Sequence, residues 1–134
     1  MAADGLITVA SGAPVGATID RLVETVTAAG MRVFARVDHA AGAAEVGMEL
    51  RPTELVLFGH PRGGTPLMQD RQTAGIDLPL KALAWEDADG CVWLTADDPH
   101  FIARRHGLGD RSRDAVAALA AALEGVTGVA VSRI

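Results

Sequence analysis

Cysteine, lysine and tyrosine are almost absent from this 134-residue sequence, which has one cysteine, one lysine and no tyrosine. The single cysteine, Cys91, cannot form a disulfide within the chain, which is typical of proteins in a reducing compartment. The N-terminus has no basic segment followed by an apolar run, so it does not resemble a signal peptide. No uninterrupted stretch reaches the ~20 apolar residues of a membrane helix. These absences predict a cytoplasmic protein without a membrane-spanning segment.

An excess of positive charge is also missing, because 17 acidic residues outnumber 12 basic ones and the net charge is −5. A negative surface repels phosphate backbones and anionic membranes. Four arginines cluster between residues 104 and 113, but acidic residues at 97, 98, 110 and 114 surround them. The sequence therefore predicts neither nucleic acid nor a membrane as a partner.

The remaining composition is that of an ordinary globular domain, with 49 % apolar and 22 % charged residues. A chain of this length is expected to form a single domain over residues 1–134 and to bury roughly two-thirds of the surface that it exposes when unfolded. Such a core needs neither a disulfide nor a metal, and the sequence indicates no cofactor.

Hydrophobic periodicity predicts strands interspersed with helices. Apolar residues recur at helical spacing from Val15 to Val26, and Gly30 follows where a helix is expected to end. The full pattern predicts strands at 6–10, 31–37, 55–58, 78–85 and 91–95, helices at 14–29, 39–46, 99–106 and from 110 or 112 to 125, and a strand or tail at 126–134. The Asp89-Gly90 pair is typical of a hairpin turn. We expect an α+β fold with a mixed, mostly antiparallel sheet of about five strands and helices packed on one side.

Residues 59–66 are predicted to form a glycine-rich loop directly after the buried strand at 55–58. Backbone N–H groups in such a loop can bind an anion. The segment lacks the lysine of a phosphate-binding P-loop, and it does not contain the Gly-x-Gly-x-x-Gly pattern of dinucleotide-binding proteins. The alternative is that its glycines and prolines form a turn and allow close packing, which is the commoner role of such residues.

The four histidines, His39, His60, His100 and His106, do not have the spacing of a metal site on one helix. His100 and His106 are six residues apart and lie on different helix faces. His39 falls in the first turn of a predicted helix, where positive charge is unfavourable, which makes it the most unusual of the four. A structural, hydrogen-bonded histidine is nevertheless commoner than a catalytic one.

The predicted hairpin carries the single cysteine and both tryptophans. Cys91 is expected to be a small buried side chain in a strand, without the basic neighbour that would activate a thiol. Trp85 and Trp93 lie on opposite arms, so we expect them to pair across the strands or to cover an interface.

Several runs resemble a known family. They are FGHPRGGTPLM at residues 58–68, DLPL at 77–80, Trp85-Glu86-Asp87 and Arg105-His106-Gly107. Together they resemble the bacterial and archaeal family called domain of unknown function 302, over nearly the whole chain. The resemblance implies a small α+β domain with an antiparallel sheet, and a homodimer, but no assigned activity. The family often has asparagine where this chain has His60, which argues against an essential chemical role for that side chain.

The leading hypothesis is a noncatalytic, homodimeric domain that binds a small molecule or a protein partner near residues 59–68. Its candidate ligand-binding residues are His39, Gly59, Pro61, Gly64 and Thr65. These positions match the signature that the resemblance implies.

Two alternatives remain open at this point. The chain is an enzyme of unknown reaction if His39 and the 59–68 segment form one site, which requires His39 and Thr65 to share a pocket. It holds a metal if His39 and His60 meet in the fold, although their spacing gives this hypothesis little support.

Overall fold

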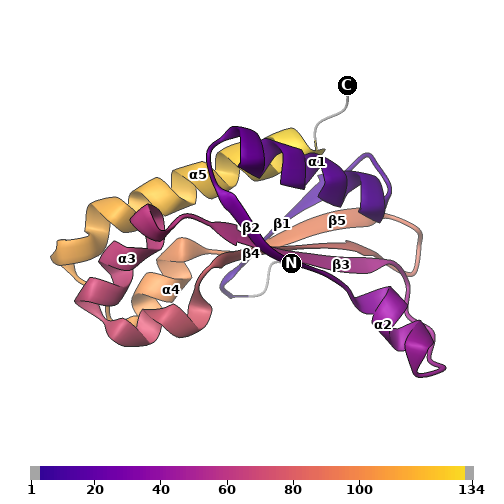
Figure 1. Cartoon of the computed structure of the whole chain (residues 1–134), viewed down its shortest axis with the longest axis horizontal. Coiled ribbons are helices and arrows are strands. Elements are labelled where there is room, and N and C mark those ends of the chain that lie inside the picture. Colours follow the sequence, from indigo (N-terminus) through magenta and orange to yellow (C-terminus); the bar gives the residue numbers. More distant parts are fainter. Residues whose placement is uncertain (1–3, 132–134) are drawn as a thin grey trace.

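The computed structural model describes residues 4–131 (Figure 1). Within this range it confirms the α+β class, with a single five-stranded sheet and helices packed on it. The elements are β1 (Leu6–Ser11), α1 (Val15–Ala28), β2 (Arg32–Asp38), α2 (His39–Glu45), β3 (Thr53–Gly59), α3 (Pro61–Asp70), the 3₁₀ helix η1 (Gln72–Asp77), β4 (Leu80–Glu86), β5 (Val92–Asp97), α4 (Pro99–His106), the 3₁₀ helix η2 (Asp110–Ser112) and α5 (Arg113–Val131).

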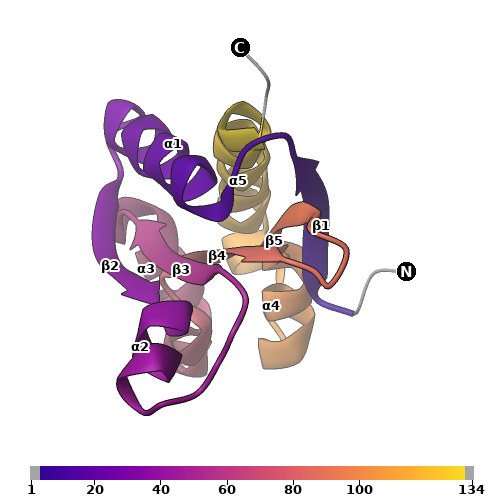
Figure 2. The same cartoon turned by 90° about the vertical axis from the view of Figure 1, so that its right-hand side faces the viewer.

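The sheet has the strand order β1-β5-β4-β3-β2, and every neighbouring pair is antiparallel. The sheet is therefore entirely antiparallel, where the sequence predicts a mixed, mostly antiparallel one. Strand β4 lies at its centre. Helices α1 and α5 cover one face of the sheet (Figures 1 and 2). Helices α3 and α4 lie beyond one end of the strands, and α2 lies beyond the other end (Figure 1). Of the described elements, no helix covers the opposite face between α2 and α4.

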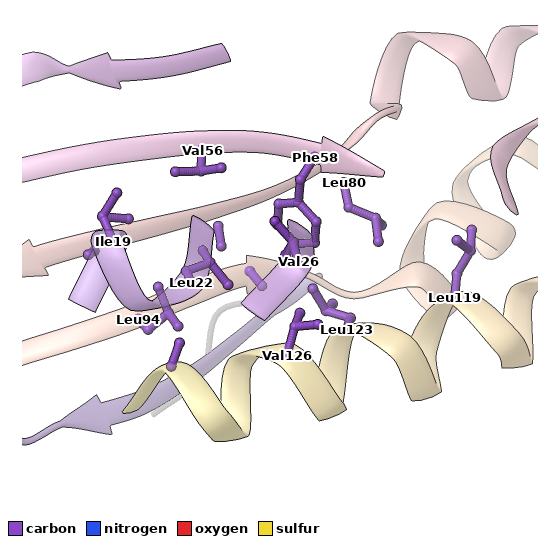
Figure 3. Packing of buried hydrophobic residues seen from close by; sticks show 14 of the residues in the cluster. Ile19, Leu22, Val26, Val56, Phe58, Leu80, Leu94, Leu119, Leu123 and Val126 are labelled. Carbon is purple, nitrogen blue, oxygen red and sulfur yellow. The ribbon is translucent and has the colours of Figure 1, made fainter. Parts of the chain in front are cut away.

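The core lies between the sheet and the pair α1 and α5. Side chains alternate between the faces of a strand, so Val56 and Phe58 of β3 both point to the helices and are fully buried. The apolar stripe predicted on α1 is buried against them, as Figure 3 shows for Leu22 and Val26. The apolar face that the two-residue period gives to β3 and the apolar stripe that the helical period gives to α1 therefore pack against each other in a single core.

Two predicted elements at the C-terminal end are wrong. The last helix does not end at Gly125 but continues to Val131, and the part of the predicted strand 126–134 that the structure describes is helical. A glycine inside a helix costs about 1 kcal/mol relative to alanine. Val126 and Ala130 continue the buried stripe beyond Gly125, so packing outweighs that local cost. Residues 132–134 lie outside the described part.

The same helix bears on the expectation about membrane spans. The 22-residue stretch Asp110–Val131 contains an 18-residue window with a mean hydropathy of 1.6, so by length and composition alone it is long and apolar enough to cross a membrane. In this structure its apolar stripe packs on α1, α3, α4 and the sheet. Many of the remaining positions are exposed alanines and glycines, which raise the hydropathy although they are not buried in the core.

The β4–β5 hairpin confirms the predicted tryptophan pair. Trp85 and Trp93 are direct partners with ring centroids 6.4 Å apart. Asp87 holds the turn, because its carboxylate accepts hydrogen bonds from Trp93 Nε1 and from the backbone N–H of Cys91, both at 2.9 Å. These bonds lower the pKa of Asp87 below its ordinary value. Cys91 itself is exposed in the turn, so the expectation of a buried cysteine is wrong.

Candidate functional site

The predicted loop at 59–66 is mostly helix, because α3 begins at Pro61. His60 is the N-cap, and its Nδ1 accepts the backbone N–H of Arg62 at 3.1 Å. Pro61 occupies the first turn, where the N–H that it lacks would have no helical partner. Asparagine, which the family resemblance places at this position, is also a good N-cap. The side chain at position 60 thus has a structural role at the start of α3.

The backbone amides of this segment are not available as an anion cradle. The N–H groups of Gly63 and Gly64 donate to the carbonyl oxygen of His60, at 2.9 and 3.3 Å. The alternative interpretation, in which the glycines of residues 59–66 allow close packing, therefore fits the structure better than an anion-binding loop. A Cβ on Gly63 would lie 3.0 Å from Leu119 Cδ2, and one on Gly64 would lie 3.3 Å from Leu78 Cδ1. Small residues here allow α3 to approach α5 and the segment before β4.

A hollow of about 260 Å³, here called the α3 pocket, opens beside the first turns of α3. Four of the five predicted ligand-binding residues line it, namely Gly59, Pro61, Gly64 and Thr65. The rest of the lining is His60, Phe34, Met68, Gly75, Leu78, Pro79, Leu80 and Leu119. The pocket is therefore mainly apolar, which is the usual character of a small-molecule site.

Phe34 reaches this pocket from β2 because the strand is irregular there. The register of β2 against β3 shifts between Val33 and Ala35, which leaves Phe34 as an extra residue in the pairing. Such a bulge redirects a side chain. Phe34 is 52 % exposed although it is one of only three phenylalanines, so an aromatic ring forms an open wall of the pocket.

A second hollow of about 460 Å³, here called the rear pocket, adjoins the first. The two share Gly59, His60, Leu80 and Leu119 as lining residues. The rear pocket extends toward the end of α1 and the outer side of α5, with Met31 and Arg62 also in its lining. His60 thus stands between two adjacent apolar hollows.

His39, the fifth predicted residue, is not part of this site. It is the first residue of α2, next to Asp38, which pairs with Glu54 near the start of β3. Gly59 and the α3 pocket lie at the other end of that strand, roughly 20 Å away for seven residues of extended chain. His39 therefore shares a pocket with neither Thr65 nor His60. Both the enzyme hypothesis built on His39 and the metal hypothesis are wrong in that form.

A cluster that sequence reasoning missed joins α4 to η1. His106 Nε2 lies 2.6 Å from Asp77 Oδ2, and His106 Nδ1 lies 3.0 Å from Thr73 Oγ1. Arg105 donates to both oxygens of the same carboxylate. The order hydroxyl, imidazole, carboxylate is that of a hydrolytic triad, but none of these side chains lines the α3 or the rear pocket. We interpret the cluster as a clamp that fixes the segment before β4, and with it the wall formed by Leu78 and Pro79.

Comparison with known proteins agrees with this architecture. The family model described as "Domain of unknown function DUF302" matches residues 7–126. The chain belongs to the DUF302 family. The earlier resemblance is thereby confirmed over nearly all of the described residues.

A solved DUF302 protein from Bacillus stearothermophilus has the same fold, with a TM-score of 0.84 over 97 % of this chain and 100 % of that one. Its sequence is 17 % identical, so the likeness concerns the fold alone. Curated relatives of this DUF302 chain are named "Fluoride-specific ion channel FluC 1", from Brucella suis and Brucella abortus. Both are 54 % identical over 115 residues. These matches cover 86 % of this chain but only 45 % and 43 % of the relatives, so the chain spans less than half of their length.

Proposed function

We propose that this DUF302 domain is a binding module that holds a small, largely apolar molecule in the α3 pocket without transforming it. The observation that carries the proposal is the convergence of Gly59, Pro61, Gly64 and Thr65 with the bulged Phe34 around one hollow. The ion-channel relatives are more than twice as long as the matched segment, so this role concerns the shared segment. Fluoride conduction would then reside in the part of those proteins that the chain does not match.

The polar groups of the pocket favour binding over catalysis. His60 Nδ1 is occupied by the N–H of Arg62, so it is not free to take a proton from a substrate. No carboxylate lines the α3 pocket among the described residues. A nucleophile with a base and an orienting acid is therefore not assembled there, because the imidazole–carboxylate pair of His106 and Asp77 lies outside its lining.

Filling the pocket should abolish binding without unfolding the domain. Thr65 is exposed and lines the α3 pocket, so Thr65→Trp places an indole in the hollow. With 2-naphthylmethanol as the probe, we expect amide NMR shifts at Gly59, Gly64 and Gly75 in the original chain and none in the variant. Thr27→Trp is the matched control, because Thr27 is an exposed residue of α1 that lines neither the α3 pocket nor the rear pocket. Shifts that are equal in both variants, or that avoid α3, contradict the proposed site.

We also propose that the domain forms a homodimer, and that the sheet face without helices is its interface. This face carries Leu55 and Leu57 of β3, Leu83 and Trp85 of β4, and Trp93 and Thr95 of β5. Its polar groups are bonded within the chain. Trp85 Nε1 donates to Thr95 Oγ1 at 2.8 Å, and Lys81 lies 3.3 Å from Asp97.

A face of this kind suits a second copy of the same chain. Two identical surfaces repel each other if they carry net charge, but here the lysine and the aspartate compensate each other. Polar atoms that already have partners lose little when water leaves. Substitutions on this sheet face can therefore test whether the domain forms a homodimer.

A charge in the middle of that face should separate the dimer. We expect light scattering to give twice 13.9 kDa for the original chain and 13.9 kDa for Leu83→Lys. Leu6→Lys with Val37→Lys provides a second variant if the first does not fold, because both residues lie at the rims of the face and are 40 % and 37 % exposed. Ile76→Lys, on η1, is the control. A folded Leu83→Lys dimer, or a monomeric original chain, overturns the interface.

A further inference from the structure

The two hollows beside α3 have an unusual charge for this chain. The chain has 17 acidic and 12 basic residues, yet no aspartate or glutamate lines either the α3 pocket or the rear pocket. The ionisable side chains in their lining are His60 and Arg62. By contrast, the hollow between β1, β5 and α5 is lined by Asp98 and Glu124 together with His100. A lining without carboxylates, with Arg62 in the rear pocket, is thus a local property of the α3 region.

Arg62 is not neutralised by a neighbour. The arginines at positions 36, 104, 105 and 113 form ion pairs with carboxylates at 4.0 Å or less. Arg62 has no carboxylate or hydrogen-bond partner for its guanidinium among the described residues. A guanidinium binds a carboxylate through paired N–H donors. An unpaired one beside an apolar hollow therefore favours a ligand that brings its own negative charge.

His60 adds a second donor at the same place. Its Nδ1 accepts the N–H of Arg62, so in the neutral imidazole the proton is on Nε2. His60 is exposed and lines both hollows, so Nε2 is the atom left to donate to a bound molecule. The start of α3 also contributes the positive end of its helix dipole. His60 lies in the lining that the two pockets share, and Arg62 lines the rear pocket beside it.

We propose that the ligand of this domain is a small organic carboxylate with an apolar body. The inference rests on the proposed function and specifies the ligand class of the same site. The apolar body occupies the α3 pocket against Phe34, Met68 and Leu78. The carboxylate lies at the rim beside His60 and accepts hydrogen bonds from Nε2 and from the guanidinium of Arg62.

Three probes with one ring system separate the ligand class from the site. They are 2-naphthoate, 2-naphthylmethanol and 2-naphthylmethylammonium, which differ mainly in charge. By NMR titration at constant salt we expect naphthoate to bind about tenfold more tightly than the alcohol, which corresponds to about 1.4 kcal/mol. The ammonium probe should bind most weakly, because its positive charge is repelled by the guanidinium of Arg62.

The variant Arg62→Gln tests whether this residue causes the preference. We expect it to bring naphthoate to the affinity of the alcohol and to leave the alcohol unchanged. Arg71→Gln is the matched control, since Arg71 follows α3 but lines neither pocket. His60→Asn, which keeps an N-cap, should lower the naphthoate preference partially.

The outcomes distinguish the two proposals. Equal binding of the alcohol and the carboxylate overturns the ligand class and leaves the proposed function intact. A preference for naphthoate that survives Arg62→Gln overturns the role of Arg62. Failure of all three probes to shift the amides around the α3 pocket overturns the proposed function, and the ligand class with it.

Discussion

Replacing Phe58 with alanine is expected to lower the free energy of unfolding by about 3–5 kcal/mol. Phe58 is fully buried on β3 and lies between the sheet and the helices, close to Val26 and Leu80 (Figure 3). Truncation removes the buried ring and leaves a cavity that the surrounding strands and helices cannot close completely. Urea denaturation monitored by circular dichroism measures the loss.

Phe34→Ala is the control for this experiment, because the same atoms are removed from a residue that is 52 % exposed. We expect a loss of less than about 1 kcal/mol from this surface position, together with weaker binding of 2-naphthylmethanol. Equal losses for the two variants would contradict the burial of Phe58 in the core between the sheet and the helices. If Phe34→Ala binds the probe as tightly as the original chain does, Phe34 does not contact the ligand in the proposed site.

Replacing Asp77 with alanine is expected to cost about 2–3 kcal/mol, since a charged hydrogen-bond acceptor is removed from a nearly buried partner. The His106 side chain is 8 % exposed and that of Asp77 is 18 % exposed. Without the carboxylate, the His106 Nε2 and the guanidinium of Arg105 lose their shared acceptor. Thermal and urea denaturation of the variant measure the effect.

Asp110→Ala is the matched variant, because Asp110 pairs with Arg113 on the surface and its side chain is 85 % exposed. Exposed ion pairs contribute little to stability, so this substitution should leave the midpoint almost unchanged. If Asp77→Ala is equally harmless, the cluster does not act as a clamp. A further expectation is that loss of the clamp weakens probe binding, because Asp77 directly precedes the pocket residues Leu78 and Pro79.

Much of the architecture could be predicted because local pattern and tertiary packing agree there. The stripe on α1 and the starts of the helices at residues 39 and 99 occur where the sequence predicts them. In the structure Asp38 and Asp98 cap these two helices, and the left-handed Gly107 ends α4. In each case the residue that begins or ends the helix acts within one turn of its own position. Such signals do not depend on the rest of the chain.

The predictions that failed depend on distant partners. Helix α3 contains Pro66, Gly63 and Gly64, which disfavour helix locally, but its N-cap and its close packing on α5 stabilise it. The bulge at Phe34 depends on the register against β3. The pair of His106 and Asp77 joins residues 29 positions apart. The sequence does not show which end of β3 lies near His39. The structure places His39 at the end opposite the α3 pocket.

The sheet places the first strand beside the last one, and this has a consequence for the order in which the domain assembles. Thr8 of β1 and Thr95 of β5 are hydrogen-bonded although 87 residues separate them. During synthesis β1 leaves the ribosome first, yet its neighbour is made only after most of the chain. The hairpin of β4 and β5 and the pair of β2 and β3 need much shorter loops to close. We therefore expect β1 to dock late, as a final step that completes the edge of a sheet already formed.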